Sequence, residues 1–143
     1  MVRSDSTRKR LAGVALSERL SAEGYTHEMT DRTFRALFDE VRAGLKSGYP
    51  VIADAVFSSP SQRSAVADIA KAEGVPFTGL WLEAPPDVMS RRVAGRTRNV
   101  SDADAGVLEM QLDYQLGDID WIKIDSSGPR EETLKTGLKM IGD

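Results

Sequence analysis

GYPVIADAVFSSP (Gly48–Pro60) is the stretch of sequence that decides the fold. Its centre, Tyr49–Phe57, is a short apolar run, rich in β-branched residues, that carries one acid, Asp54. Such a run predicts a buried parallel strand. Gly48 can end a preceding helix in a left-handed conformation, and Ser58-Ser59-Pro60 can cap and begin the next one. The stretch therefore predicts a helix, a strand and a helix in succession.

The helix before this strand is predicted over Glu28–Lys46. Its apolar residues follow helical spacing and should face the sheet: Phe34, Leu37, Phe38, Val41 and Leu45. The helix after the strand begins at Pro60 and should end at Gly74. An earlier amphipathic helix is predicted over Ser4–Leu20, with Ser4 or Asp5 as its cap.

Strands and helices continue to alternate toward the C-terminus. Strands are predicted at Phe77–Leu82 and Trp121–Asp125, and further helices after Pro85-Pro86, over Ser101–Gln115 and over Pro129–Met140. Parallel strands need crossover connections of about this length. The pattern predicts a layered α/β fold with a parallel sheet, and the 143 residues are taken as one domain, 1–143.

Composition excludes several kinds of function. The chain has no cysteine, so disulfides, thiolate catalysis and cysteine zinc sites are excluded, and a reducing cytoplasmic location is expected. A net charge of −3 from well-mixed signs gives no broad basic field for nucleic acid or anionic membranes. With His27 as the single histidine, a hydrolase triad would have to be built around it.

Five short motifs occur in a familiar order. They are RSDSTRKRL at the start, the GYPVIADAVF strand, LWLEAP, RVAGRTR followed by SDAD, and IDSSG near the end. In this order they resemble small P-loop kinases, the group of gluconate, shikimate and chloramphenicol kinases and zeta toxins. The likeness is greatest to kinase-like domains attached to aminoglycoside-phosphotransferase-like proteins. It implies a three-layer P-loop NTPase-like fold, ATP and Mg²⁺ as cofactors, and a small-molecule acceptor.

The resemblance assigns the acceptor side of the site to Asp5, Arg3 and Arg8. Asp5 would accept the proton of the acceptor hydroxyl, and the two arginines would bind an anionic group. The alternative is that Asp5 caps the first helix and the arginines are solvated.

Asp54 corresponds by the same resemblance to the acid that holds Mg²⁺ beside the phosphates, directly or through water. A carboxylate within an apolar run is costly to bury alone, so it needs a cation, backbone donors or the solvent-facing end of the strand. An acid that caps a turn at the end of the strand is the alternative.

The resemblance also implies cofactor contacts near the C-terminus. Arg92, Arg96 and Arg98 fall where the lid of such kinases begins, and Ser126 to Gly128 fall at the turn near the adenine. Cations are also favourable in the last turn of any helix, and IDSSG is also an ordinary turn between strand and helix.

The sequence lacks the motif that cradles phosphates in these kinases, GxxxxGK[ST]. Gly44-Leu45-Lys46-Ser47 is only a superficial match at the end of a predicted helix. We therefore expect an N-terminally truncated domain without its first strand and phosphate-binding loop, inactive as given. A non-catalytic α/β binding or assembly module is the alternative from another functional class.

Loss of the first strand has a structural consequence. In the kinases that this chain resembles the strand order is 2-3-1-4-5, so the lost strand would lie between those at Val51–Val56 and Phe77–Leu82. Unpaired strand edges are templates for association. We therefore expect a homo-oligomer or a marginally stable monomer.

Overall fold

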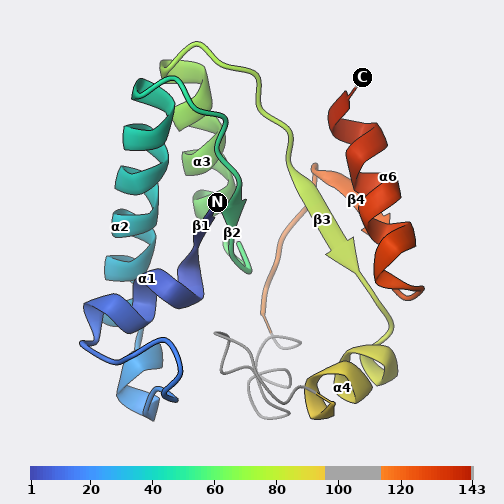
Figure 1. The fold of residues 1–143 in the computed structure, drawn as a ribbon, viewed down its shortest axis with the longest axis horizontal. Helices are drawn as coiled ribbons and strands as arrows, with labels where there is room; N and C mark the ends of the chain where they lie inside the picture. The colour runs from blue at the N-terminus through green and yellow to red at the C-terminus, as the bar shows by residue number, and fades with distance from the viewer. Residues whose placement is uncertain (96–113, 143) are drawn as a thin grey trace. The chain divides into compact units, whose positions relative to one another are not determined.

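The computed structural model describes residues 1–95 and 114–142. Within these residues the chain forms two compact units, one of Met1–Val75 and one of residues 76–95 and 114–142. Figure 1 shows the helices and strands of each unit along the chain. Each unit has its own pair of parallel strands flanked by helices, which confirms the predicted α/β fold class.

The first unit is organised around two very short strands. β1 (Val2–Arg3) pairs in parallel with β2 (Ala53–Asp54), in a register that places Arg3 opposite Asp54. Three helices and one 3₁₀ turn complete the unit: α1 (Ser4–Leu11), η1 (Ala22–Tyr25), α2 (His27–Lys46) and α3 (Pro60–Ala72). The predicted strand Tyr49–Phe57 is thus mostly loop, and its Ile52 and Val56 are exposed rather than buried.

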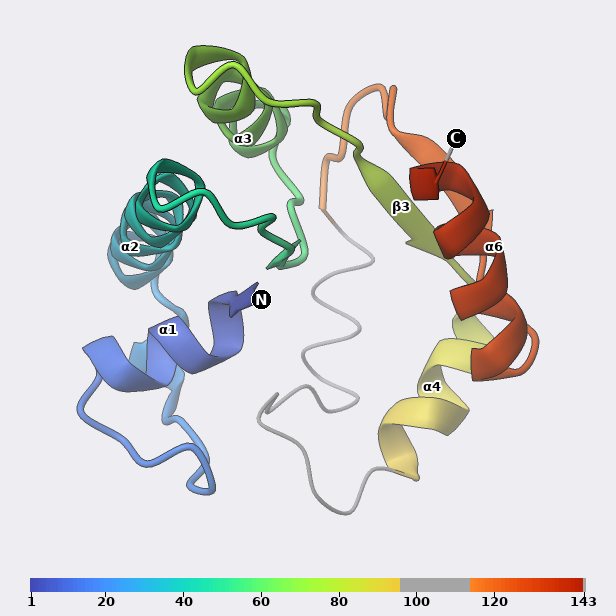
Figure 2. The same cartoon turned by 45° about the horizontal axis from the view of Figure 1, so that its top comes forward.

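The core of the first unit lies between α2 and α3, which run side by side in Figures 1 and 2. The ring of Phe34 meets that of Phe57 edge to face, with centroids 5.6 Å apart. The other buried apolar residues are Leu37 and Val41 of α2 and Val66, Ile69 and Ala70 of α3. The predicted face of α2 is confirmed for Phe34, Leu37 and Val41. Phe38 and Leu45 are only half-buried.

The start of α3 follows the predicted capping chemistry, whereas α1 has no side-chain cap and Ser4 and Asp5 lie within its first turn. The Thr26 hydroxyl accepts a hydrogen bond from the Met29 amide at the start of α2. Ser59 and Gln62 form a capping box at the start of α3, with Pro60 in its first turn. Gly48 and Gly74 have the positive φ angles that the sequence predicts after each helix.

The predicted first helix, Ser4–Leu20, is too long. α1 ends at Leu11, because Gly13 turns the chain with a φ of 70°. The Lys9 side chain is buried and its ammonium donates to the Leu16 carbonyl, which fixes the loop that follows α1. Val14, Ala15 and Leu20, which the prediction placed on the apolar face of this helix, therefore lie in a loop.

The second unit contains the longer strand pair. β3 (Leu80–Glu83) pairs in parallel with β4 (Ile122–Asp125), with Leu80 opposite Ile122. The helices are α4 (Pro86–Ala94) and α6 (Arg130–Gly142), and α6 packs on β4. The predicted helix Ser101–Gln115 falls almost wholly outside the described residues.

β3 begins three residues later than the predicted strand Phe77–Leu82. Gly79 lies so close to the indole of Trp121 that an added Cβ atom would be 2.4 Å from the ring. The Gly79 carbonyl accepts from the Ile122 amide, and the regular ladder begins only after it. The indole of Trp121 therefore lies against Gly79 at the start of the strand pair.

The two strand pairs, β1-β2 and β3-β4, are the pairs that the expected order 2-3-1-4-5 leaves when its first strand is absent.

In the described part of the chain no helix is both long and apolar enough to span a membrane.

Candidate functional site

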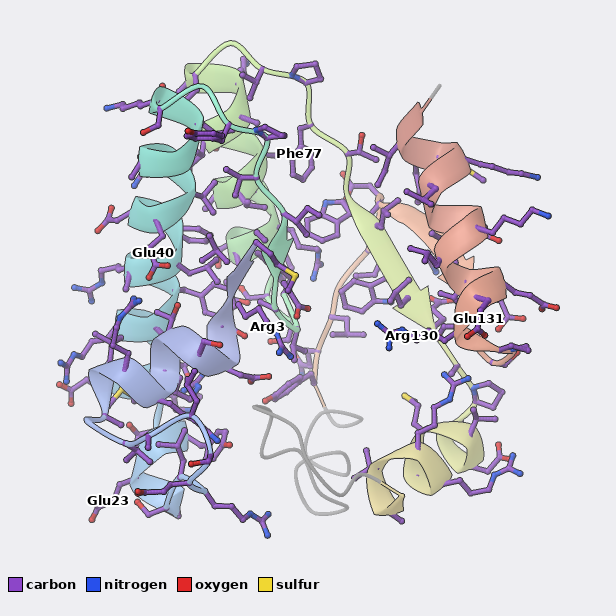
Figure 3. The ribbon with its side chains drawn as sticks, in the orientation of Figure 1. Arg3, Glu23, Glu40, Phe77, Arg130 and Glu131 are labelled. Carbon is purple, nitrogen blue, oxygen red and sulfur yellow. The ribbon has the colours of Figure 1, made fainter. Side chains whose placement is uncertain are left out.

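The first candidate site lies at the carboxyl ends of β1 and β2. The parallel register brings Arg3 and Asp54 together, and Arg3 Nε donates to Asp54 Oδ2 at 3.0 Å. Ligands of open α/β sheets bind outside the carboxyl ends of parallel strands. Figure 3 labels Arg3 at this end of β1.

Asp5 joins the same cluster from the first turn of α1. Arg3 Nη2 lies 3.9 Å from Asp5 Oδ2, so one guanidinium faces both acids. All three side chains remain partly exposed to solvent. The structure thus brings together three of the four residues that the sequence assigned to acceptor and metal binding.

The donor chemistry of this cluster fits Mg²⁺. Mg²⁺ prefers oxygen ligands and is bound through one or two carboxylates, with water and substrate phosphates completing its shell. Asp54 and Asp5 could supply such carboxylates, and the metal would help to neutralise phosphate charge. Across residues 1–95 and 114–142, no group of three or more acidic or histidine side chains is placed to hold a metal ion. Water and substrate phosphates would therefore have to supply the remaining ligands.

Arg8 makes contacts within the protein. Its Nη1 donates to the Gly24 carbonyl at 2.8 Å and to the Thr30 hydroxyl at 3.2 Å. Its guanidinium also lies over the Tyr25 ring, 5.3 Å from the centroid. These bonds attach α1 to η1 and α2. To bind a substrate anion, Arg8 would have to share its guanidinium with these partners or exchange them for the anion.

Arg63, a buried cation in the same unit, was missed by sequence reasoning. It is 3% exposed, and its Nη1 donates to the Phe57 carbonyl at 2.7 Å. Phe57 has a φ of 47°, which is uncommon for an aromatic residue and follows Asp54 closely in the chain. The sequence signal for its burial was helical spacing, since Arg63 shares a helical face with the core residues Val66 and Ala70.

A second cluster surrounds the turn after β4, in the other unit. Arg92 Nη2 donates to the carbonyls of Ser127 and Gly128, at 3.1 and 2.7 Å. The Ser126 hydroxyl and amide both donate to the Glu83 carbonyl. Arg92 and Ser126 therefore hold the turn from both sides.

Asp125 also shapes this turn, a role that sequence reasoning did not assign to it. Its Oδ1 accepts from the Ser127 amide at 2.8 Å, the pattern by which Asp commonly stabilises a turn. The Asp-Ser-Ser-Gly sequence carries the signal for it. Hydrogen bonds from the Ser127 side chain and backbone hold the pKa of Asp125 below its usual value, and the charge of Arg92 adds to the effect.

We expect Ser127→Ala to raise the Asp125 pKa part of the way toward its usual 3.8, because the side-chain bond is lost and the backbone bond remains. A carboxyl group whose pKa is lowered by folding stabilises the fold above its unfolded-state pKa. That contribution is lost as pH falls through the lowered folded-state pKa. NMR titration of the Asp125 side-chain carboxyl carbon measures this pKa in the unmodified chain and in Ser127→Ala. An unchanged pKa would show that the Ser127 hydroxyl contributes nothing.

Comparison with known proteins decides the family. A model of the AAA domain family matches residues 1–116, most of the chain. The chain belongs to this family. It is a P-loop kinase-like domain.

Two solved structures share the fold of this kinase-like domain. One is an unliganded sugar kinase from a Janibacter species, and the other is the tunicamycin resistance protein of Deinococcus radiodurans. Each has a TM-score of 0.63 at 18% identity and covers 98% of this chain, which spans 78% and 80% of theirs. At that identity the likeness shows the fold alone. No curated protein sequence matched the chain.

The remaining predicted cofactor residues of the kinase-like domain divide into two groups. Arg92, Ser126 and Gly128 come together at the turn after β4. Arg96 and Arg98 lie outside the described residues. Nucleotide binding by any of them stays a prediction.

Proposed function

We propose that this kinase-like domain derives from ATP-dependent phosphotransferases that act on a small hydroxyl-bearing molecule. The observation that supports this most directly is the cluster of Arg3, Asp5 and Asp54 at the carboxyl ends of β1 and β2. In it, Asp5 acts as the base on the acceptor hydroxyl and Asp54 as the metal-side acid. Arg3 and Arg8 bind the anionic part of the substrate, and the protein works in the cytoplasm.

The substrate class has separate support. One solved structure of the same fold is described as a sugar kinase, and a sugar is a small molecule rich in hydroxyl groups. The carboxylate of Asp5 is partly exposed, so an acceptor hydroxyl has access to it. A general base must come within hydrogen-bonding distance of the proton that it removes.

The 143-residue chain by itself should not catalyse phosphoryl transfer. Catalysis of this reaction depends almost entirely on positioning and on electrostatic stabilisation of the phosphates. The sequence contains no GxxxxGK[ST], so no loop of that type places backbone amides and a lysine around the phosphates. Arginine contacts alone would then have to hold the nucleotide.

We expect ATP with Mg²⁺ to bind this chain with a dissociation constant of roughly 1 mM or weaker. Isothermal titration calorimetry measures it, with Asp54→Ala as the matched variant. A micromolar constant that Asp54→Ala abolishes would show that the chain binds nucleotide without a phosphate-binding loop.

The coding sequence upstream of Met1, read in frame, tests the ancestry separately. A G-x-x-x-x-G-K-S motif about 20–40 residues earlier would supply the absent strand, loop and helix. The longer protein should then phosphorylate a small hydroxyl compound, and Asp5→Asn should abolish the transfer. Stop codons in that stretch would favour a non-catalytic domain.

A non-catalytic α/β binding or assembly module remains the second candidate. The favouring observation is that Arg3, Arg8 and Arg92 all donate to partners within the protein. Such arginines can serve the scaffold alone. The upstream coding sequence separates the candidates, because stop codons there favour a module of this kind and an in-frame phosphate-binding motif favours the kinase.

A further inference from the structure

α6 uses only part of its surface to pack on its own strand pair. Gly137 faces the strand pair, since a Cβ atom there would lie 3.8 Å from Leu80 Cδ1 and 3.9 Å from Ile124 Cδ1. Ile124 beneath it is buried. In contrast, no residue of α6 itself is buried.

A second face of α6 carries apolar side chains that remain in solvent. Leu134, Leu138 and Ile141 are 59%, 60% and 58% exposed. Their spacing of four and then three residues places them in one line along the helix, which we call the α6 stripe. A line of this spacing is the seam by which two helices pack in a coiled coil.

The charges beside the α6 stripe differ between its two ends. Glu131, labelled in Figure 3, lies in the first turn of α6, and Lys135 and Lys139 follow toward the C-terminus. A shallow hollow over this surface is lined by Glu131, Leu134, Lys135, Leu138 and Lys139. With Arg130, Glu131 and Glu132 in the first turn, the stripe has a mildly acidic beginning and a basic end.

We propose that the α6 stripe binds the α6 stripe of a second copy of this chain, with the two helices antiparallel. In that arrangement Leu134 of each copy meets Leu138 of the other, and each Glu131 lies toward the lysines of the other copy. A parallel pair would set acid beside acid and base beside base. This proposal does not rest on the proposed function.

The same charges argue against a membrane as the occupant. Helices that lie on anionic lipid carry lysine and arginine along their polar face, whereas Glu131 flanks the first turn of this stripe. The net charge of the chain, −3, adds no attraction to such a surface. A second copy would bury the apolar side chains of the stripe and bring its acidic and basic ends together.

The association should be weak. Three apolar side chains on one 13-residue helix offer less than the ~800 Å² per partner of a standard stable interface. We expect a dissociation constant on the order of 10–1,000 µM, so dimers should appear only as concentration rises.

Sedimentation velocity of the full chain from roughly 10 µM to 1 mM spans this range. The unmodified chain should shift from monomer to dimer, and the double variant Leu134→Lys/Leu138→Lys should remain monomeric throughout. Thr136→Lys is the control for added positive charge, since it introduces one lysine at an exposed position off the stripe and should dimerise normally. A monomeric unmodified chain, or a double variant that dimerises equally well, would overturn the proposal.

The absence of cysteine from the sequence allows a direct test of orientation. Leu134→Cys and Leu138→Cys variants each introduce a single thiol. An antiparallel dimer should form disulfides several-fold faster in an equal mixture of the two variants than in either alone, because position 134 faces position 138. Faster crosslinking within each variant by itself would show a parallel pair and contradict the proposed arrangement.

Discussion

Leu37→Ala should lower the free energy of unfolding by about 2–5 kcal/mol, among the largest effects of any single substitution in this chain. Leu37 is 0% exposed, at the centre of the core between α2 and α3. Truncation removes buried methyl groups and leaves a cavity that the surrounding helices can fill only in part.

Denaturant unfolding followed by far-ultraviolet circular dichroism measures this change. Leu16→Ala is the matched control, since Leu16 is 51% exposed and its loss should change stability by less than about 0.5 kcal/mol. Trp81 and Trp121 both lie in the second unit, so tryptophan fluorescence reports on that unit. A Leu37→Ala effect no larger than that of Leu16→Ala would contradict the assigned core.

Arg63→Met should be the second large effect, about 1.5–3 kcal/mol of destabilisation. The substitution keeps most of the aliphatic side chain but removes the donor to the Phe57 carbonyl. A buried acceptor that loses its partner keeps the full cost of its desolvation. The backbone of Phe57, with its positive φ, also loses the bond that holds it in place.

Arg42→Met is the matched control for Arg63→Met. Arg42 is exposed and pairs with Asp39 at 3.1 Å within the same helix. Such surface pairs contribute little, so we expect less than about 0.5 kcal/mol. Equal effects of the two substitutions on the denaturation midpoint would rule out a special role for the buried guanidinium.

Helices were predicted well where local signals agreed. α2 begins within one residue of its predicted start and ends at Lys46 as predicted, because apolar spacing and Gly48 indicate the same element. α1 was predicted too long because scattered apolar residues continue past Gly13. A single glycine that turns the chain outweighs a weak periodicity.

Strands were predicted in the right places but with the wrong extent. An apolar run such as Tyr49–Phe57 marks a strand, but pairing lasts only as long as a neighbour runs beside it. β1 contributes two residues, so β2 has two. For the same reason Asp54, which the sequence placed within a buried strand, lies at the exposed end of a short one.

The sequence by itself determined the alternation of strands and helices, the kinase-like family resemblance and the absence of a phosphate-binding motif. These follow from local spacing, capping residues and the order of short motifs, which are all properties of neighbours along the chain. Only the tertiary structure decided which side chains meet. The register of β1 and β2 pairs Arg3 with Asp54. Arg8 and Arg63 donate hydrogen bonds to backbone carbonyls of the protein. The α6 stripe remains exposed to solvent. The contacts of Arg3 and Arg8 join residues far apart in sequence, so they depend on how the elements pack, which local patterns do not encode.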